Sequence, residues 1–501
     1  MTRTFLFVRP PRPLWPFNGP STAFWPPLAF ASLAAALRDG VPDVRVEILD
    51  APALHMGWRT LTREIHARRP AWVGIGEEAV SCVEGLRVAR VAKDAGALVV
   101  AGGCFFGHVA AEALRTGCID VVVHGEGEQT IVELVQALQS GRWRDLARVA
   151  GISFADGEEI VTTPPRALLP DLDRLPMPAY DLLPVERYGG GSRNHPNLAA
   201  IELGRGCVGA CGFCVLWRQM GRTVGNRVVP QLRTKSAGRL LDEIRRLTRQ
   251  FDRRYLAWVD PCFNADPRVP GELAERLLRN GIAVGQSAWL RGDCTVRDAR
   301  SGALARLVAA GLNEVYLGVE RPDAESLHTL NKTASLDDTR EAFALLERDH
   351  PHVFTVGSFI YGLPGDTPAS VRAMYRFAND LGMDKTFFIP LAPLPGTTFW
   401  RPELWDPTGE RFRAFDFLPS AGGDVHGATL GRALLSACAF DWTAARVRSN
   451  LARLRHADAR KRRMARRIFL RSTAFAASAL VRGLVGRDGV GGMVLPRWYE
   501  S

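Results

Sequence analysis

Three closely spaced cysteines, Cys207, Cys211 and Cys214, are the residues of this sequence best placed to do chemistry. Glycines in the same stretch let the backbone curl tightly around a bound group. Three thiolates at this spacing suit an iron–sulfur cluster, whereas a structural zinc ion takes a fourth protein ligand. A cubane cluster held by three cysteines leaves one iron free to bind a substrate-like molecule. We therefore expect a catalytic cluster, and a zinc knuckle or three unrelated core thiols are the alternatives.

The composition is that of a globular protein. The chain has 501 residues, of which 47% are hydrophobic, and this length allows about three domains. The odd total of nine cysteines does not fit a disulfide framework, so we expect a reducing compartment, the cytoplasm. The first apolar run, Phe5–Val8, is too short for a signal peptide or a membrane span.

The net charge of +11 is concentrated near the end of the chain. Between Arg446 and Arg487 there are thirteen Lys or Arg residues and one acid, Asp458. Apolar residues recur among them at helical spacing, but the charges are too many for a bilayer-spanning helix. The pattern is typical of a helix on an anionic membrane surface, and equally of solvated helices packed on the protein. Both interpretations stay open.

The first 140 residues alternate short β-branched runs with helical stretches, which predicts a doubly wound α/β domain with a parallel sheet. Ligands of such sheets bind in the crevice beyond the carboxyl ends of the strands. Two of these ends carry Gly102-Gly103 and Gly125-Glu126, which we expect to contribute to a binding face. The strands are expected at residues 4–8, 44–49, 72–75, 97–101 and 120–123.

A proline-rich linker is expected at 141–197, and a second α/β domain at 198–400. Six strand–helix repeats in this domain predict a partly closed parallel barrel with its chemistry at the carboxyl ends of the strands. The cysteine loop follows the first of these strands. We expect 401–501 to be a mainly helical region. Aromatic residues at its start and just before it are expected to form a lid on the barrel, namely Trp400, Trp405, Phe412, Phe415 and Phe417.

The cysteine loop, with Phe213 directly before the third cysteine, resembles the signature of the radical S-adenosylmethionine (SAM) enzymes. The region before it resembles the cobalamin-binding domain of the cobalamin-dependent members, through Trp25-Pro26-Pro27, Gly102-Gly103 and Gly125-Glu126-Gly127-Glu128. The resemblance implies a Rossmann-like cobalamin domain before a partial (β/α)6 TIM-type barrel. It also implies three cofactors, a [4Fe–4S] cluster, SAM and cobalamin. The motif that supplies a histidine to cobalt elsewhere is absent, so we expect His55 at the surface.

The same resemblance marks four positions of the barrel as SAM contacts. It implies that Asp260 lies near the SAM amino group, although an aspartate at this place also suits a helix N-cap. Arg291 ends the third strand region, and Glu320 matches a polar SAM contact of the family, but Arg321 replaces the usual serine beside it. Gly357 matches the glycine-rich fifth strand beside the adenine.

The function implied by the resemblance is methyl transfer to an unactivated carbon of a small molecule, through a 5′-deoxyadenosyl radical. Oxidative cyclases of bacteriochlorophyll biosynthesis share these motifs and stay open as an alternative. An RNA methylthiotransferase would need three further cluster cysteines, and Cys82, Cys104 and Cys118 are too dispersed for that role. We expect a tetrapyrrole or lipid-like substrate, an electron donor of flavodoxin or ferredoxin type, and no DNA partner. A peripheral contact with the inner face of the membrane would use the basic tail.

Overall fold

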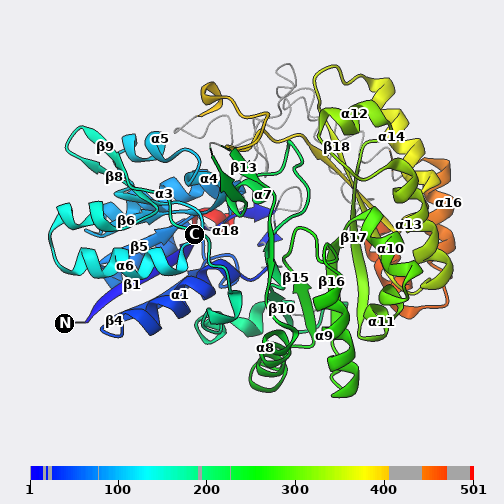
Figure 1. The fold of residues 1–501 in the computed structure, drawn as a ribbon, viewed down its shortest axis with the longest axis horizontal. Coiled ribbons are helices and arrows are strands. Elements are labelled where there is room, and N and C mark those ends of the chain that lie inside the picture. Colours follow the sequence, from blue (N-terminus) through cyan, green and yellow to red (C-terminus); the bar gives the residue numbers. More distant parts are fainter. Residues whose placement is uncertain are drawn as a thin grey trace.

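The computed structural model consists of two α/β domains, with short C-terminal segments packed against each of them (Figure 1). The residues that it describes are 2–14, 19–20, 25–76, 78–189, 194–225, 227–405, 440, 443–470 and 497–501.

The N-terminal domain is built on the parallel sheet that the sequence predicts. Five strands lie in the order β4-β1-β5-β6-β7, and all pair in parallel. Helices α1 and α6 share one hydrophobic core with one face of this sheet, while α2, α3 and α5 pack on the other face. The domain is therefore doubly wound. Its elements are β1 (Arg3–Arg9), α1 (Leu28–Gly40), β4 (Val44–Asp50), α2 (Trp58–Arg68), β5 (Trp72–Ile75), α3 (Cys82–Asp94), β6 (Leu98–Ala101), α4 (Gly103–Phe106), α5 (Ala110–Arg115), β7 (Val121–Val123) and α6 (Glu128–Gln139).

A β-hairpin extends this sheet into the segment expected to be a linker. Strands β8 (Ile152–Asp156) and β9 (Glu159–Thr162) add antiparallel to β7 and to each other. The turn between them contains Gly157 in the left-handed region (φ 64°), and an Asp-Gly pair between β-branched runs is a strong hairpin signal. The expectation of a linker from residue 141 was therefore wrong for residues 152–162, because the Asp156-Gly157 turn folds them into a hairpin of the N-terminal sheet.

The second domain is the expected partial barrel of six parallel strands, in the order β10-β15-β16-β17-β18-β19. Strands β10 and β18 are buried along their whole length, because helices cover the outside and side chains fill the inside. The strands are β10 (Leu198–Ile201), β15 (Tyr255–Trp258), β16 (Gly285–Leu290), β17 (Leu312–Glu320), β18 (Phe354–Tyr361) and β19 (Lys385–Pro390). The helices between them are α8 (Ala237–Gln250), α9 (Arg268–Arg279), α10 (Gly292–Arg300), α11 (Ala303–Ala309), α12 (Ala324–Thr329), α13 (Leu336–Asp349) and α14 (Pro368–Asp380).

The described part of the basic tail packs on the amino-terminal end of this barrel. Arg446 of α16 (Ala444–Arg453) donates hydrogen bonds of 2.7 Å to the backbone oxygens of Met383 and Asp384, just before β19. In the helix at 459–470, Arg460 lies 2.7 Å from Glu314. Of the two interpretations of the basic tail, packing on the protein is therefore confirmed for these residues.

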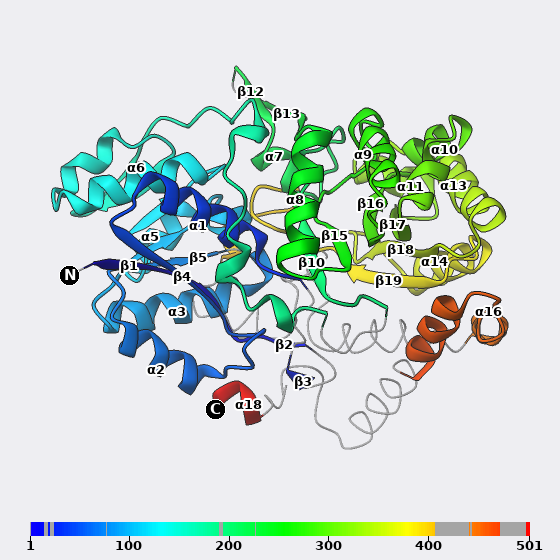
Figure 2. The same cartoon turned by 90° about the horizontal axis from the view of Figure 1, so that it is seen from below.

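The last residues return to the N-terminal domain. Helix α18 (Arg497–Glu500) lies against α2 (Figure 2). There, Tyr499 packs edge-on against Trp58. The expected lid residues Phe412, Phe415 and Phe417 lie outside the described residues. No helix in the described part of the chain combines the length and the apolar character needed to cross a bilayer.

Candidate active site

The cysteine loop begins from a two-stranded antiparallel sheet at the carboxyl end of β10. This sheet pairs β11 (Gly204–Gly206) with β14 (Leu232–Thr234). The Cys207 amide donates to the Gln231 carbonyl oxygen at 3.1 Å, and a Cβ at Gly206 (φ 95°) would lie 1.9 Å from that oxygen. Only glycine fits at the entrance to the loop, so the close backbone approach fixes where the first cysteine starts.

Segments from the other side of the barrel hold the rest of the loop. The Gly212 amide donates to the Leu330 oxygen at 2.8 Å, and the Asn331 side-chain amide donates to the Ala210 oxygen at 2.7 Å. The Thr398 amide donates to the Gly212 oxygen at 2.9 Å. The loop is thus clamped by residues that follow α12 and by the end of the barrel domain.

The space between the cysteines suits a bound group. A Cβ at Gly209 would lie 3.9 Å from the sulfurs of both Cys207 and Cys211, and 2.9 Å from Nη1 of Arg291. A Cβ at position 209 would therefore touch both thiols at ordinary van der Waals distance and would require the Arg291 guanidinium to shift. Glycine leaves a cradle there that a sulfur-rich, anionic group such as a [4Fe–4S] cluster can occupy, and Cys207, Cys211 and Cys214 would hold it.

The thiols themselves are partly buried. Burial raises the pKa of Cys214 to about 11 and also raises the pKa of Cys211, so a metal must displace their protons. Among the described residues, no three His, Cys, Asp or Glu side chains converge on one ion. Cysteines that hold a cubane each bind a different iron, so they need not converge as zinc ligands do.

Two cations and a carboxylate surround the loop. Arg291 pairs with Asp293 at 2.8 Å, and its guanidinium reaches Gly209 as described above. Glu320, in the left-handed region (φ 66°), accepts a hydrogen bond from Nζ of Lys332 at 3.2 Å. Burial lowers the pKa of Lys332, but Glu320 and the nearby Cys211 thiol outweigh this effect and raise it. The structure thus brings Arg291 and Glu320 to the cysteine loop, while their contacts with SAM stay predictions.

Lys332 was missed by the sequence analysis. It lies beyond the strand ends, in the connection between α12 and α13, where a lone lysine carries no local signal. The structure connects this segment with the site through the neighbouring Asn331, whose side-chain amide bonds to the backbone of the cysteine loop.

Asp260 supports the loop from below. It is 3% exposed, and its two carboxylate oxygens accept hydrogen bonds from the amides of Leu203 and Gly204, at 2.9 and 2.7 Å. Burial raises its pKa to about 7, against the opposing effect of these amides. The helix that follows, α9, begins at Arg268, so Asp260 is no N-cap. Its role at the SAM amino group stays a prediction, while its contact with the start of the loop is direct.

Gly357 lies in the middle of β18. A Cβ there would lie 2.3 Å from Sδ of the buried Met383 side chain, so a larger residue at this position would force that side chain to move. The next residue, Ser358, directs its hydroxyl toward Glu320 at 3.5 Å. Because successive side chains point to opposite faces of a strand, the Cβ direction of Gly357 faces away from Glu320. A contact with the adenine of SAM stays a prediction and would involve its backbone.

A cavity of about 470 Å³ lies between the two domains. Gly102, Gly103, Gly125 and Glu126, the four positions expected to bind cobalamin, all line it. The barrel contributes Glu202, Gly204 and Arg205, the approach to the cysteine loop, together with Trp258 and Trp289. Both domains therefore direct the carboxyl ends of their strands into one space.

The floor of this cavity depends on a close backbone approach. A Cβ at Gly76 (φ 101°) would lie 2.3 Å from the Gly102 oxygen, so the ends of β5 and β6 meet without side chains. Because no side chain projects from these strand ends, the cavity keeps a broad apolar wall that a flat macrocycle such as a corrin can cover. No histidine is among the described residues that line the cavity, and His55 is exposed, as expected. The wall residues include Phe5, Phe7, Trp25, Phe30 and Ile75.

The remaining cysteines form no second cluster site within the described residues. Cys82 is buried at the start of α3, Cys118 is buried in the connection between α5 and β7, and Cys104 lies on the cavity wall. Cys262 and Cys294 are buried free thiols within hydrogen-bonding reach of each other beside the strand ends.

Comparison with known families agrees with this division of the chain. The sequence model of the Radical SAM superfamily matches residues 201–378, and that of the B12 binding domain matches residues 17–135. Together they cover more than half of the chain, one domain each. The fold and the site thus define a radical SAM barrel that follows a cobalamin-binding domain. The chain belongs to the cobalamin-dependent radical SAM enzymes, whose cofactors are a [4Fe–4S] cluster, SAM and cobalamin.

Curated relatives match across both domains. An uncharacterized methyltransferase of Pyrococcus horikoshii is 28% identical over 75% of this chain and 78% of its own. The anaerobic magnesium-protoporphyrin IX monomethyl ester cyclase of Rubrivivax gelatinosus is also 28% identical, over 78% of this chain and 68% of its own. The hopanoid C-3 methylase of Methylococcus capsulatus is 27% identical, over 78% of this chain and 71% of its own.

Solved structures share the fold. The radical SAM methyltransferase TsrM of Kitasatospora setae aligns with a TM-score of 0.61 at 20% identity, over 79% of this chain and 75% of its own. The cobalamin-dependent SAM radical enzyme OxsB aligns with a TM-score of 0.60 at 17% identity, over 77% of this chain and 53% of its own. These likenesses show the two-domain fold.

Proposed function

We propose that this enzyme transfers a methyl group to an unactivated carbon of an apolar small molecule. The observation that carries the proposal is the single cavity lined by the strand ends of both domains, which continues to the approach of the cysteine loop. A substrate in that cavity would lie within reach of both cofactors. The similarity to methyltransferases that cover most of the chain supports this function.

The residues around the loop would hold SAM and the cluster in place. The thiolates of Cys207, Cys211 and Cys214 would hold the cluster, which supplies the electron that cleaves SAM. Arg291 and Lys332 place positive charge beside it, suited to an anionic cluster and to the carboxylate of SAM. The backbone clamp on the loop keeps these groups fixed during the reaction.

The cavity supports an apolar substrate. Aromatic and aliphatic side chains make up most of its wall, and pockets of this type bind ligands mainly through apolar contact. The relatives named as hopanoid and magnesium-protoporphyrin enzymes act on molecules of this character. We infer a tetrapyrrole or lipid-like substrate for this enzyme.

Oxidative cyclisation is the second candidate, because the cyclase of Rubrivivax gelatinosus is as similar as the first methyltransferase. The products of SAM separate the two reactions. Methyl transfer consumes one SAM as methyl donor and a second as radical source, so it forms S-adenosylhomocysteine as well as 5′-deoxyadenosine. Cyclisation forms no S-adenosylhomocysteine.

The test is to incubate the anaerobically reconstituted protein with hydroxocobalamin, SAM and dithionite, and to quantify both products by liquid chromatography. Cobalamin-dependent S-adenosylhomocysteine supports methyl transfer. Formation of 5′-deoxyadenosine alone, with a magnesium porphyrin ester as substrate, would favour the cyclase.

We further infer a cytoplasmic enzyme that takes electrons from a flavodoxin or ferredoxin. A peripheral contact with an anionic membrane stays a prediction, which the exposed side chains of Arg462, Arg466 and Arg467 support. Flotation of the intact protein with phosphatidylglycerol vesicles tests this contact, and flotation that does not fall with added salt would contradict it.

A further inference from the structure

Arg205 has an unusual position for a charged side chain. It lies on β11, two residues before Cys207, and only 7% of the residue is exposed. A buried guanidinium is stable only when carboxylates pair with it and its donors are used. Its partners therefore reveal what the start of the cysteine loop is attached to.

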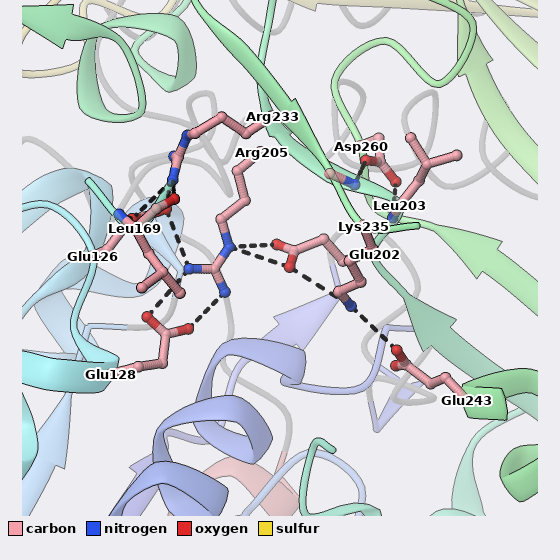
Figure 3. A network of polar contacts seen from close by, with 11 residues as sticks. Glu126, Glu128, Leu169, Glu202, Leu203, Arg205, Arg233, Lys235, Glu243 and Asp260 are labelled. Atoms are coloured by element: carbon pink, nitrogen blue, oxygen red, sulfur yellow. Dashed lines mark hydrogen bonds and ion pairs between the residues drawn. The ribbon is translucent and has the colours of Figure 1, made fainter. Parts of the chain in front are cut away.

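The partners come from both domains, as Figure 3 shows. Nη2 and Nη1 donate to the two carboxylate oxygens of Glu128 at 2.6 and 3.1 Å, a two-point contact with the first residue of α6. Nη1 also lies 3.3 Å from Glu126, and Nε lies 3.1 Å from both oxygens of Glu202 in the barrel. Burial lowers the pKa of Arg205, but Glu202 and Glu128 outweigh this effect and keep the guanidinium charged.

The neighbouring strand is attached to the same place. Arg233 of β14 lies 2.7 Å from Glu126 and donates to the Leu169 oxygen at 2.6 Å. Both strands of the β11–β14 pair thus carry a central arginine that binds the segment after β7. On the barrel side, Asp260 accepts the Gly204 amide. The start of the cysteine loop is therefore fixed from the barrel and from the cobalamin-binding domain together.

This network also faces the cofactor cavity. Glu126, Glu128, Glu202 and Arg205 all line it, beside the glycines of the cobalamin-binding domain. A group that fills the cavity therefore lies against the residues that connect the two domains. Its presence will favour the docked arrangement, in which these charges are shielded from water and paired.

We propose that Arg205 is a positioning residue that fastens the cysteine loop to the cobalamin-binding domain, so that filling the cobalamin cavity makes the loop more rigid. The link acts through Glu128 and Glu126 and couples the two cofactor sites across the domain interface. It requires only the cluster loop and the cobalamin-binding domain. It therefore holds whether the reaction is methyl transfer or cyclisation.

Hydrogen–deuterium exchange on the intact protein, with its cluster reconstituted, tests this link. The probe is hydroxocobalamin, and the readout is the exchange rate of peptides that cover residues 203–214. In the unsubstituted protein, hydroxocobalamin should slow this exchange. R205K and E128Q should exchange these amides about tenfold faster, which corresponds to about 1.4 kcal/mol of local opening. Their response to hydroxocobalamin should be lost.

R166K is the matched control. Arg166 makes a similar two-point contact with Glu133 of α6 and a 2.8 Å bond to Thr130, but it does not line the cavity. In the R166K variant, the rate of amide hydrogen exchange at residues 203–214 should equal that of the unsubstituted protein.

Two results would overturn the proposal. One is E128Q with the same loop exchange as R166K. The other is an unsubstituted protein that binds hydroxocobalamin, seen in its visible spectrum, without slower exchange at 203–214. The second measurement needs no variant, so it decides even if R205K does not fold.

Discussion

At the scale of single residues, the site depends on side chains whose partners are backbone groups. Asp260 uses both carboxylate oxygens on the amides of Leu203 and Gly204, so it fixes the strand end from which the cysteine loop departs. Lys332 and Arg291 then place positive charge against that loop. The three thiols would bind the cluster, and the residues that bond to the loop backbone fix where those thiols lie.

The cluster itself gives the most direct prediction. C211A should abolish reductive cleavage of SAM and lower the bound iron and labile sulfide, because two thiolates cannot hold a cubane with one open iron. The control is C82A, which removes a buried cysteine of α3 that belongs to no such group. Assays of iron, labile sulfide and 5′-deoxyadenosine compare the two. An active C211A protein would refute the assignment of the cluster.

Asp260 gives a prediction about pH. Its folded-state pKa of about 7 lies above its unfolded value of 3.8, so its stabilising effect is fully present below pH 3.8 and is lost as the pH rises through 7. D260N should therefore destabilise the protein more at pH 5 than at pH 8. Urea unfolding at both pH values measures the difference.

D181N is the control for that experiment. The Arg38 guanidinium lowers the pKa of Asp181, so this carboxyl stays ionised between pH 5 and 8. Its effect on stability should be the same at both values. A D260N effect that is equally independent of pH would contradict the raised pKa of Asp260.

Among the helices, strands and loops, different segments cover the two ends of the barrel. The carboxyl end carries the cysteine loop, while the amino end is covered by α16 and the helix at 459–470. There, buried Asp384 pairs with Arg453 and Lys461, and Glu314 pairs with Arg460 and His195. Part of the charge that suggested a membrane contact therefore neutralises acids of the barrel.

Arg446 provides a test of this closure. R446A should lower the free energy of unfolding by about 2–4 kcal/mol, because two buried carbonyl oxygens lose their donor. R448A, on the exposed side of the same helix, should change it by less than about 0.5 kcal/mol. Urea unfolding followed by circular dichroism compares them. Equal effects would mean that α16 does not support the barrel.

At the scale of the whole molecule, the two domains share one cavity, and neither domain forms it alone. The N-terminal domain supplies the glycine-rich strand ends, and the barrel supplies tryptophans and the approach to the cysteine loop. Ion pairs of Arg205 and Arg233 hold the two sides together. None of the three cysteines of the loop lines this cavity, so binding of cobalamin can be tested separately from assembly of the cluster.

Ala29 tests this separation. It is exposed on the first turn of α1 and lines the cavity, so A29W should fill the space and weaken binding of hydroxocobalamin by about tenfold or more. Cluster content should not change. D39W places the same side chain at the other end of α1, away from the cavity, and should bind normally. Titration followed by visible absorption measures both. Normal binding by A29W would place cobalamin elsewhere.

The features that could be predicted from the sequence are those that depend on local pattern. The spacing of Cys207, Cys211 and Cys214 indicated the cluster, and alternating apolar runs predicted both parallel sheets, because burial on two faces leaves a clear signal. Strand ends such as Gly102 and Gly125 were also predictable, since the carboxyl ends of parallel strands form the ligand face.

Contacts between residues that are distant in the sequence could be seen only in the folded protein. Lys332 joins the cysteine loop from a connection more than a hundred residues away, and Arg205 finds its partners in another domain. The basic tail has the same composition on a membrane as on a barrel, so only its contacts with Asp384 and Glu314 distinguish the two. Such pairings depend on how the chain folds back on itself, and no local spacing of residues encodes them.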